Sequence, residues 1–123
     1  MATAGATKVS AIDAAYYTVT DLDRATKFYN DLLGFEPTFT QPGVVSEYTF
    51  PGGETFGLYK SDDGIPSGSG VLFAVDDVAA AVAAAKARGV KFGEDGNVTD
   101  TPVCHMAFGI DSEGNGFILH RRK

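Results

Sequence analysis

The feature that most constrains this chain is a local pattern that occurs twice, once in each half. Residues 19–25 (VTDLDRA) open one predicted helix, and residues 75–81 (VDDVAAA) open another. Gly34 and Gly89 end the two helices, and strand patterns precede and follow each of them. Self-similarity at about half the chain length is typical of tandem modules packed into one fold.

The length and composition predict one domain with one hydrophobic core. The chain has 123 residues, of which 44% are apolar, and this is enough to bury a core without disulfides or metals. Residues 1–9 are predicted to be a flexible tail and residues 10–123 a single domain. Within the domain we expect module one at about 11–60, a turn-rich linker at 61–69 and module two at about 70–121.

Hydrophobic periodicity predicts the elements of each module. Thr20 is expected to cap the first helix and Gly34 to end it, while the second helix starts near Asp76 or Asp77 and ends at Gly89. The predicted strands are residues 11–19, 35–40, 44–50, 55–60, 71–75, 91–92, 103–110 and 117–121.

Charge, hydropathy and cysteine content exclude several classes of protein. A formal net charge of -6 argues against a nucleic-acid partner, and the basic residues 121–123 are interpreted as a solubilising tail. No apolar run is long enough to cross a bilayer, and the first ten residues lack the apolar core of a signal peptide, so we expect a cytoplasmic protein without a membrane partner. Cys104 is the only cysteine, which excludes an intrachain disulfide, and it is expected to be an inert core residue.

Four segments carry a resemblance to a known family: residues 19–25, 28–35, 75–78 and 111–115. They resemble the vicinal oxygen chelate superfamily, which includes glyoxalase I, extradiol dioxygenases, fosfomycin-modifying enzymes and bleomycin-binding resistance proteins. The resemblance implies an α+β fold. Two tandem βαβββ modules are expected to form a cupped, half-barrel mixed sheet with the helices on its convex side.

The resemblance also implies where members of the family bind a metal. Two ligand positions lie seven residues before the aspartates that start the helices, and two lie just before a leucine on the closing strands. In this chain those positions hold Ala14, Gly70, Gly57 and Ile118, none of which offers a donor atom. Since a bound cation needs oxygen, nitrogen or sulfur ligands, we predict no metal, no cofactor and no metal-dependent catalytic residue.

Strand alternation predicts which residues face the cup, because successive side chains point to opposite faces. Residues on the same face as Ala14 and Gly70 are Tyr16, Thr18 and Leu72.

A hairpin that turns at Gly52-Gly53 sets the face of the neighbouring strands. It is predicted to place Tyr48 opposite Gly57, so that Tyr48 and Tyr59 point into the cup and Glu47 points toward the helices.

On residues 103–110 the alternate apolar positions are predicted to face the core, which leaves His105 on the cup side, near His120 of the last strand. These apolar positions are Cys104, Met106, Phe108 and Ile110. Aromatic rings with hydroxyl groups suit a planar or amphipathic ligand. The predicted ligand-binding residues are Tyr16, Thr18, Tyr48, Tyr59, Leu72, His105 and His120.

These observations favour a metal-free protein that binds a hydrophobic, planar or cationic small molecule. A homodimer is expected from the resemblance, since half-barrels of this type complete their cavities against a second copy. One alternative is an enzyme of the same fold without metal, with His105 or His120 as acid or base and Glu47 as a further candidate. Another is a dimeric interaction or regulatory module.

Overall fold

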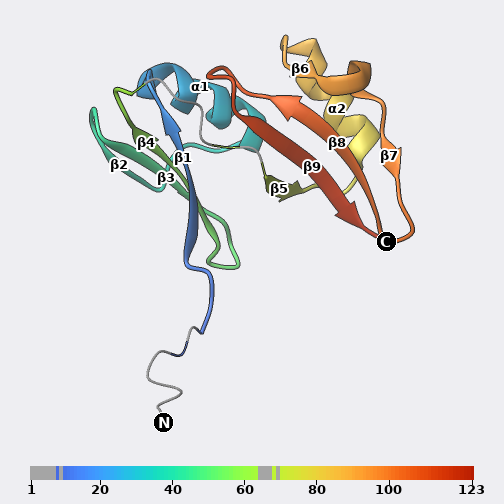
Figure 1. Ribbon diagram of the computed structural model, residues 1–123, viewed down its shortest axis with the longest axis horizontal. Coiled ribbons are helices and arrows are strands. Elements are labelled where there is room, and N and C mark those ends of the chain that lie inside the picture. Colours follow the sequence, from blue (N-terminus) through green and yellow to red (C-terminus); the bar gives the residue numbers. More distant parts are fainter. Residues whose placement is uncertain (1–7, 9, 64–67, 69) are drawn as a thin grey trace.

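The structure is a computed structural model that describes residues 8, 10–63, 68 and 70–123. Most of the predicted tail and part of the predicted linker therefore lie outside the described residues. In chain order the elements in Figure 1 are β1 (Ala14–Val19), α1 (Leu22–Leu33), β2 (Phe39–Gln41), β3 (Val45–Thr49), β4 (Thr55–Lys60), β5 (Val71–Ala74), α2 (Val78–Ala87), β6 (Lys91–Phe92), the 3-10 turn η1 (Gly93–Gly96), β7 (Thr99–Asp100), β8 (Cys104–Ile110) and β9 (Gly116–Arg122).

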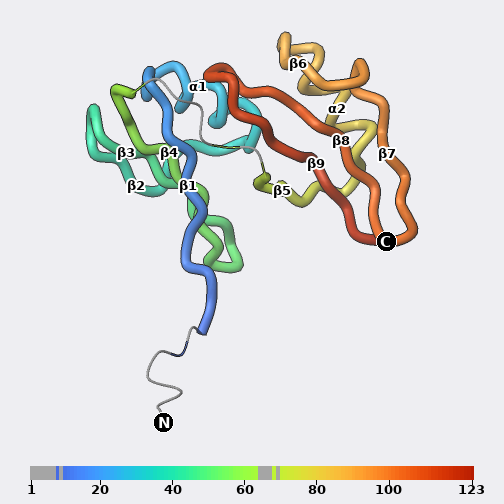
Figure 2. The backbone as a smooth tube through the Cα atoms, in the orientation of Figure 1, coloured from blue at the N-terminus to red at the C-terminus, as the bar shows by residue number. Residues whose placement is uncertain are grey.

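The strands form two mixed sheets, one from each half of the chain. The first has the order β1-β4-β3-β2 and the second β5-β9-β8-β6, with β7 paired to β8. In each sheet the strand before the helix lies parallel to the last strand of its half, and the other pairs are antiparallel. Figures 1 and 2 show the first sheet at the left and the second at the right. This arrangement confirms the predicted α+β fold.

The two helices begin in the same way, which is the structural basis of the sequence repeat. The side chain of Asp21 accepts a hydrogen bond from the amide of Arg24, and that of Asp77 accepts one from Ala80, both at 3.0 Å. The cap predicted at Thr20 is therefore wrong by one residue. In the described part of the chain, neither helix is long and apolar enough to cross a membrane.

A single hydrophobic core runs through both modules. Tyr29 of α1 is fully buried, and its ring lies 4.9 Å from that of Phe56 in the first sheet and 6.2 Å from that of Phe73 in the second. Phe56 and Phe73 also contact each other, with ring centroids 5.1 Å apart. The helix of module one thus packs against strands of both modules, which fixes how the two sheets are placed.

The hairpin between β3 and β4 differs from the prediction by one residue. Its loop holds three residues, because Phe50 donates its amide to the carbonyl of Glu54 and Gly53 takes a φ of 97°. A left-handed glycine at the end of a three-residue loop is a common hairpin geometry. Since a slip of one residue moves every side chain to the other face, Tyr48 turns to the core and Glu47 to the other side of the sheet, the reverse of the prediction.

The face predicted for β8 is also reversed. Ala107 and Gly109 lie toward the core, and a side-chain carbon at Gly109 would come within 2.3 Å of the ring of Phe117. Phe108 and Ile110 point away from the core and are exposed. The prediction assigned the more apolar residues of this strand to the core. The packing instead needs small residues, Ala107 and Gly109, where the ring of Phe117 lies against β8.

Candidate ligand-binding site

Each sheet has one face packed on the core and one face free of helices, which we call its open face. The open faces carry six large apolar side chains, each between 43% and 54% exposed. On the first sheet these are Tyr16, Phe39 and Tyr59, and on the second they are Leu72, Phe108 and Ile110. Eight large apolar side chains are exposed in the described chain, so most of them lie on these two faces.

Five of the seven predicted ligand-binding residues lie on the open faces. In the first sheet Tyr16 pairs with Gly57 and Thr18 pairs with Tyr59. The three predicted residues Tyr16, Thr18 and Tyr59 therefore lie on the same face. In the second sheet Leu72 pairs with Ile118, and His120 continues the same face two residues along β9. The structure therefore places these five residues on the predicted faces.

Tyr48 is not on an open face. It is fully buried, and its hydroxyl group donates to Asn30 Oδ1 at 2.7 Å and lies 3.0 Å from the carbonyl oxygen of Thr26. Burial of the phenol, together with the charge of Glu36, raises the pKa of Tyr48 above its ordinary value. Tyr48 therefore ties β3 to α1, and its predicted place in the cup is wrong.

His105 faces the opposite side of the second sheet from His120. It pairs with Arg121 in register, and its Nε2 lies 3.5 Å from Oδ1 of Asp100 on β7. The pKa of Asp100 is lowered, chiefly by its hydrogen bond and ion pair with Lys123. The two histidines therefore lie on opposite faces of the second sheet, and of the two only His120 is on the open face.

Three residues of the open faces were not predicted from the sequence: Phe39, Phe108 and Ile110. Phe39 lies on an edge strand, opposite Glu47, and its face was hidden by the wrong hairpin register. Phe108 pairs with Ile118, and paired residues lie on the same face of a sheet. The predicted cup face of Ile118, carried across the β8–β9 turn, would therefore have placed Phe108 and Ile110 on the open face.

The positions that hold a metal in related proteins do not fit one here. Ala14, Gly70 and Ile118 lack donor atoms, and the ring of Tyr16 lies over Gly57, where an added side-chain carbon would be 2.3 Å from Cε2 of that ring. Over residues 8, 10–63, 68 and 70–123, no group of three or more His, Cys, Asp or Glu gathers in a metal-binding arrangement. No step of a reaction is therefore assigned to a metal.

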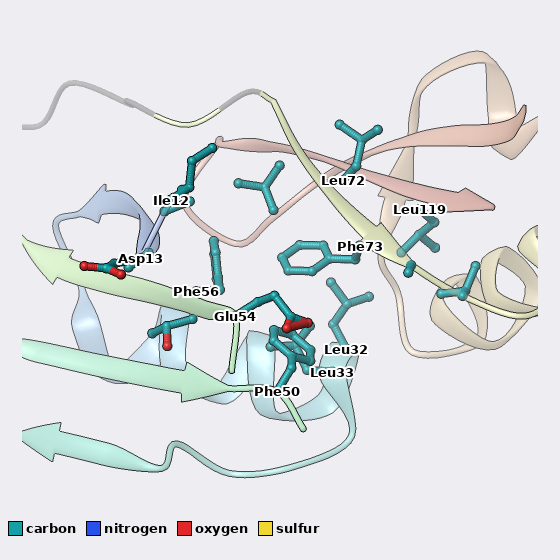
Figure 3. A pocket seen from close by; sticks show the side chains of 16 residues that line it. Ile12, Asp13, Leu32, Leu33, Phe50, Glu54, Phe56, Leu72, Phe73 and Leu119 are labelled. Carbon is teal, nitrogen blue, oxygen red and sulfur yellow. The ribbon is translucent and has the colours of Figure 1, made fainter. Parts of the chain in front are cut away.

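A cavity of about 420 Å³ lies between the modules, which we call the inter-module cavity. It lies among the start of β1, the end of α1, the β3–β4 hairpin and β5 (Figure 3). Its lining is mostly apolar, with the rings of Phe50, Phe56 and Phe73. Its volume is within the range of ligand pockets, about 300–1,000 Å³.

Comparison with solved structures supports a common fold. An antibiotic-binding protein, TnmS3, from Streptomyces sp. CB03234 is 27% identical, with 95% of this chain and 99% of that chain covered at a TM-score of 0.78. A glyoxalase/bleomycin resistance protein from Albidiferax ferrireducens T118 is 24% identical (91% and 98% covered, TM-score 0.72). A lactoylglutathione lyase from Agrobacterium tumefaciens is 20% identical (94% and 96% covered, TM-score 0.74). These last two show the fold alone.

Comparison at the level of sequence identifies the family. None of the curated proteins matches this sequence. The model of the glyoxalase/bleomycin resistance protein/dioxygenase superfamily matches residues 11–114, which is most of the chain. On this evidence the chain belongs to the glyoxalase/bleomycin resistance protein/dioxygenase superfamily.

Proposed function

We propose that this protein binds an apolar, planar small molecule on its open faces and holds it without metal and without chemical conversion. The observation that carries the proposal is the set of six large apolar side chains on the two open faces. Apolar side chains gathered on one surface are typical of binding sites, because a contiguous exposed patch is otherwise costly in water.

The similarity to TnmS3 supports this class of function. That structure is described as an antibiotic-binding protein, and it resembles this chain over nearly the whole length of both. The net charge of -6 favours a ligand with a positive charge, through the summed field of the protein.

A second copy of the chain is proposed to complete the site. The open faces are two separate surfaces in one chain, and neither encloses a ligand by itself. A homodimer that brings open faces together would bury the exposed rings and enclose the ligand between subunits.

The binding proposal is tested by calorimetry with the purified protein, a chelator and two planar probes, proflavine and its uncharged relative acridine. Tyr59→Thr and Phe108→Thr remove large side chains that line the open faces but not the inter-module cavity. We expect each to weaken binding of both probes by about fivefold to thirtyfold, the effect of a lost apolar contact of about 1–2 kcal/mol.

The matched control is Val103→Thr, which removes an exposed apolar side chain outside the strands that form the open faces. It is expected to leave both affinities unchanged. Equal losses in all three variants, or no binding to the wild-type protein, would contradict the proposal.

The metal-free part of the proposal has its own test. Titration of chelator-treated protein with Zn²⁺, Mn²⁺ and Ni²⁺ is expected to give no stoichiometric binding, because the four positions offer no side-chain donor. Uptake of one ion per chain at micromolar affinity, retained in Cys104→Ser and His120→Ala, would refute it.

A further inference from the structure

We propose that the inter-module cavity is a second binding site, and that it takes an apolar or aromatic molecule with a protonated amine beside Glu54. It is distinct from the open faces, because of the six open-face apolar residues only Leu72 also lines it. The cavity is large enough for a drug-sized molecule, at about 420 Å³.

The apolar part of the ligand is matched by three phenylalanine rings. Phe56 and Phe73 come from different modules and lie edge to face at 5.1 Å, and Phe50 lies at the hairpin. Figure 3 shows the first two rings side by side, with Glu54 next to Phe50. Aromatic faces also attract a cation within about 6 Å.

The charge of the site is negative. The cavity is lined by two carboxylates, Asp13 and Glu54, and by no basic side chain. Among the described residues neither carboxylate has an ion pair, so their charge is free to act on a ligand. The Glu54 carboxylate folds back over Gly52, where an added side-chain carbon would come within 2.2 Å of it, and the glycine therefore makes room for that position.

The C-terminal end of α1 also borders the cavity. Leu32 and Leu33, the last two residues of the helix, line the cavity. The carbonyl end of a helix carries a partial negative charge, but the Arg88 guanidinium group donates to the Asp31 carbonyl oxygen there at 2.7 Å and offsets it. The negative charge of the site therefore comes from Asp13 and Glu54, the two carboxylates labelled in Figure 3.

The test uses the full chain and a fluorescent probe, dansylcadaverine, which joins a planar ring system to a protonated amine. Its N-acetyl derivative has the same rings and no charge. We expect the wild-type protein to bind the amine more tightly than the acetylated dye. Glu54→Gln is expected to weaken binding of the amine by roughly fivefold at low salt and to leave binding of the acetylated dye unchanged.

Asp23→Asn is the matched control. It removes the same charge at the opposite end of α1 and is expected to change neither affinity. If Asp23→Asn and Glu54→Gln weaken binding of the amine equally, the effect comes from the long-range electrostatic field of the protein and the proposal is wrong.

A second variant locates the dye. Ala15 is an exposed residue of the cavity lining, and Ala15→Phe is expected to abolish binding of both dyes while the melting temperature stays within a few degrees. Tyr59→Thr, which alters an open face, is expected to keep dye binding.

The reverse pattern, with loss in Tyr59→Thr and full binding in Ala15→Phe, would put the dye on the open faces and overturn this inference while supporting the proposed function. A dye affinity that falls as the protein concentration rises would show that a second copy covers the cavity, and would also overturn it.

Discussion

Single residues tie the two modules together through a buried polar network around Asp111. The hydroxyl group of Tyr29 donates to Asp111 Oδ2 at 2.7 Å, and Oδ1 accepts the amides of Glu113 and Asn115 at 2.8 Å each. Burial raises the pKa of Tyr29, with the charge of Asp111 as the second cause, so the phenol stays protonated and remains a donor. The residues of the family-like segment 111–115 thus serve as a structural connection between α1 and the β8–β9 turn.

Tyr29→Phe tests this connection. The change leaves Asp111 Oδ2 buried without its donor, and we expect the free energy of unfolding to fall by about 1–3 kcal/mol in urea titrations. Tyr59→Phe, which removes a hydroxyl group from an exposed ring, is the control and should stay within about 0.5 kcal/mol of wild type. Equal stability of the two variants would refute a structural role for the bond.

The ion pair between Arg24 and Glu113 makes stability depend on pH. The guanidinium group donates from Nε to Oε2 at 2.6 Å and from Nη2 to Oε1 at 2.9 Å, and this pairing lowers the pKa of Glu113 below its ordinary value of 4.5. A carboxylate whose pKa is lowered in the folded state stabilises the protein above its unfolded pKa, and this stability is lost as the pH falls through the lowered value.

Glu113→Gln is therefore expected to destabilise the protein by about 0.5–1.5 kcal/mol at pH 7, a modest amount because the Arg24 side chain is 58% exposed. The difference from wild type should shrink as the pH is lowered below 4.5. Urea titrations at several pH values measure it, with Glu94→Gln as an exposed control. A difference that stays constant down to pH 2 would contradict the assignment.

At the scale of elements, the helix ends and the faces of β1, β4, β5 and β9 followed from local residues, whereas the faces of β3 and β8 did not. The start of α1 depends on a hydrogen bond between Asp21 and Arg24, three residues apart, and its end depends on Gly34 with a left-handed φ of 87°. Both signals are local, so the sequence predicted the helix to within one residue at its start. The faces of Tyr48 and Glu47 depended on whether the β3–β4 loop had two or three residues, and Pro51-Gly52-Gly53 allows both. The face of Phe108 depended on which rings cross the sheet, which no local pattern encodes.

The cap of α2 is a prediction at this scale. Seven of the ten residues of α2 are alanine, so the helix forms readily, but its first turn relies on the Asp77 side chain bonded to the amide of Ala80. Asp77→Ala is expected to cost about 1 kcal/mol in chemical denaturation. Asp77→Asn keeps a capping side chain and should retain most of the stability. If both variants lose stability equally, capping is not the cause.

At the scale of the whole molecule, the shared core predicts that both modules unfold together. All five tyrosines lie in module one, at positions 16, 17, 29, 48 and 59, and the chain has no tryptophan, so tyrosine fluorescence comes only from side chains of the first half. We expect its thermal midpoint to coincide with the calorimetric transition of the entire chain. Two resolved transitions would show that the contacts of Tyr29 with Phe73 do not couple the modules.

The proposed homodimer gives another prediction at this scale. If open faces are buried between copies, the melting temperature should rise with protein concentration, since association stabilises the folded state by mass action. Phe108→Lys places a charge on an open face and is expected to shift the protein toward the monomer in sedimentation velocity runs. Val103→Lys is the control. A monomer at all concentrations would rule out the dimer.

The ring of Tyr16 over Gly57 sets the order in which substitutions could build a metal site on this sheet. A glutamate or histidine gained at position 57 would meet that ring before it met any ion, so it would bring a steric cost and no benefit. Tyr16 would have to change first, and that step alone would strip an aromatic surface from the protein. Under the proposed function, the ring that offers apolar surface to a ligand is thus the same ring that excludes a metal ligand from position 57.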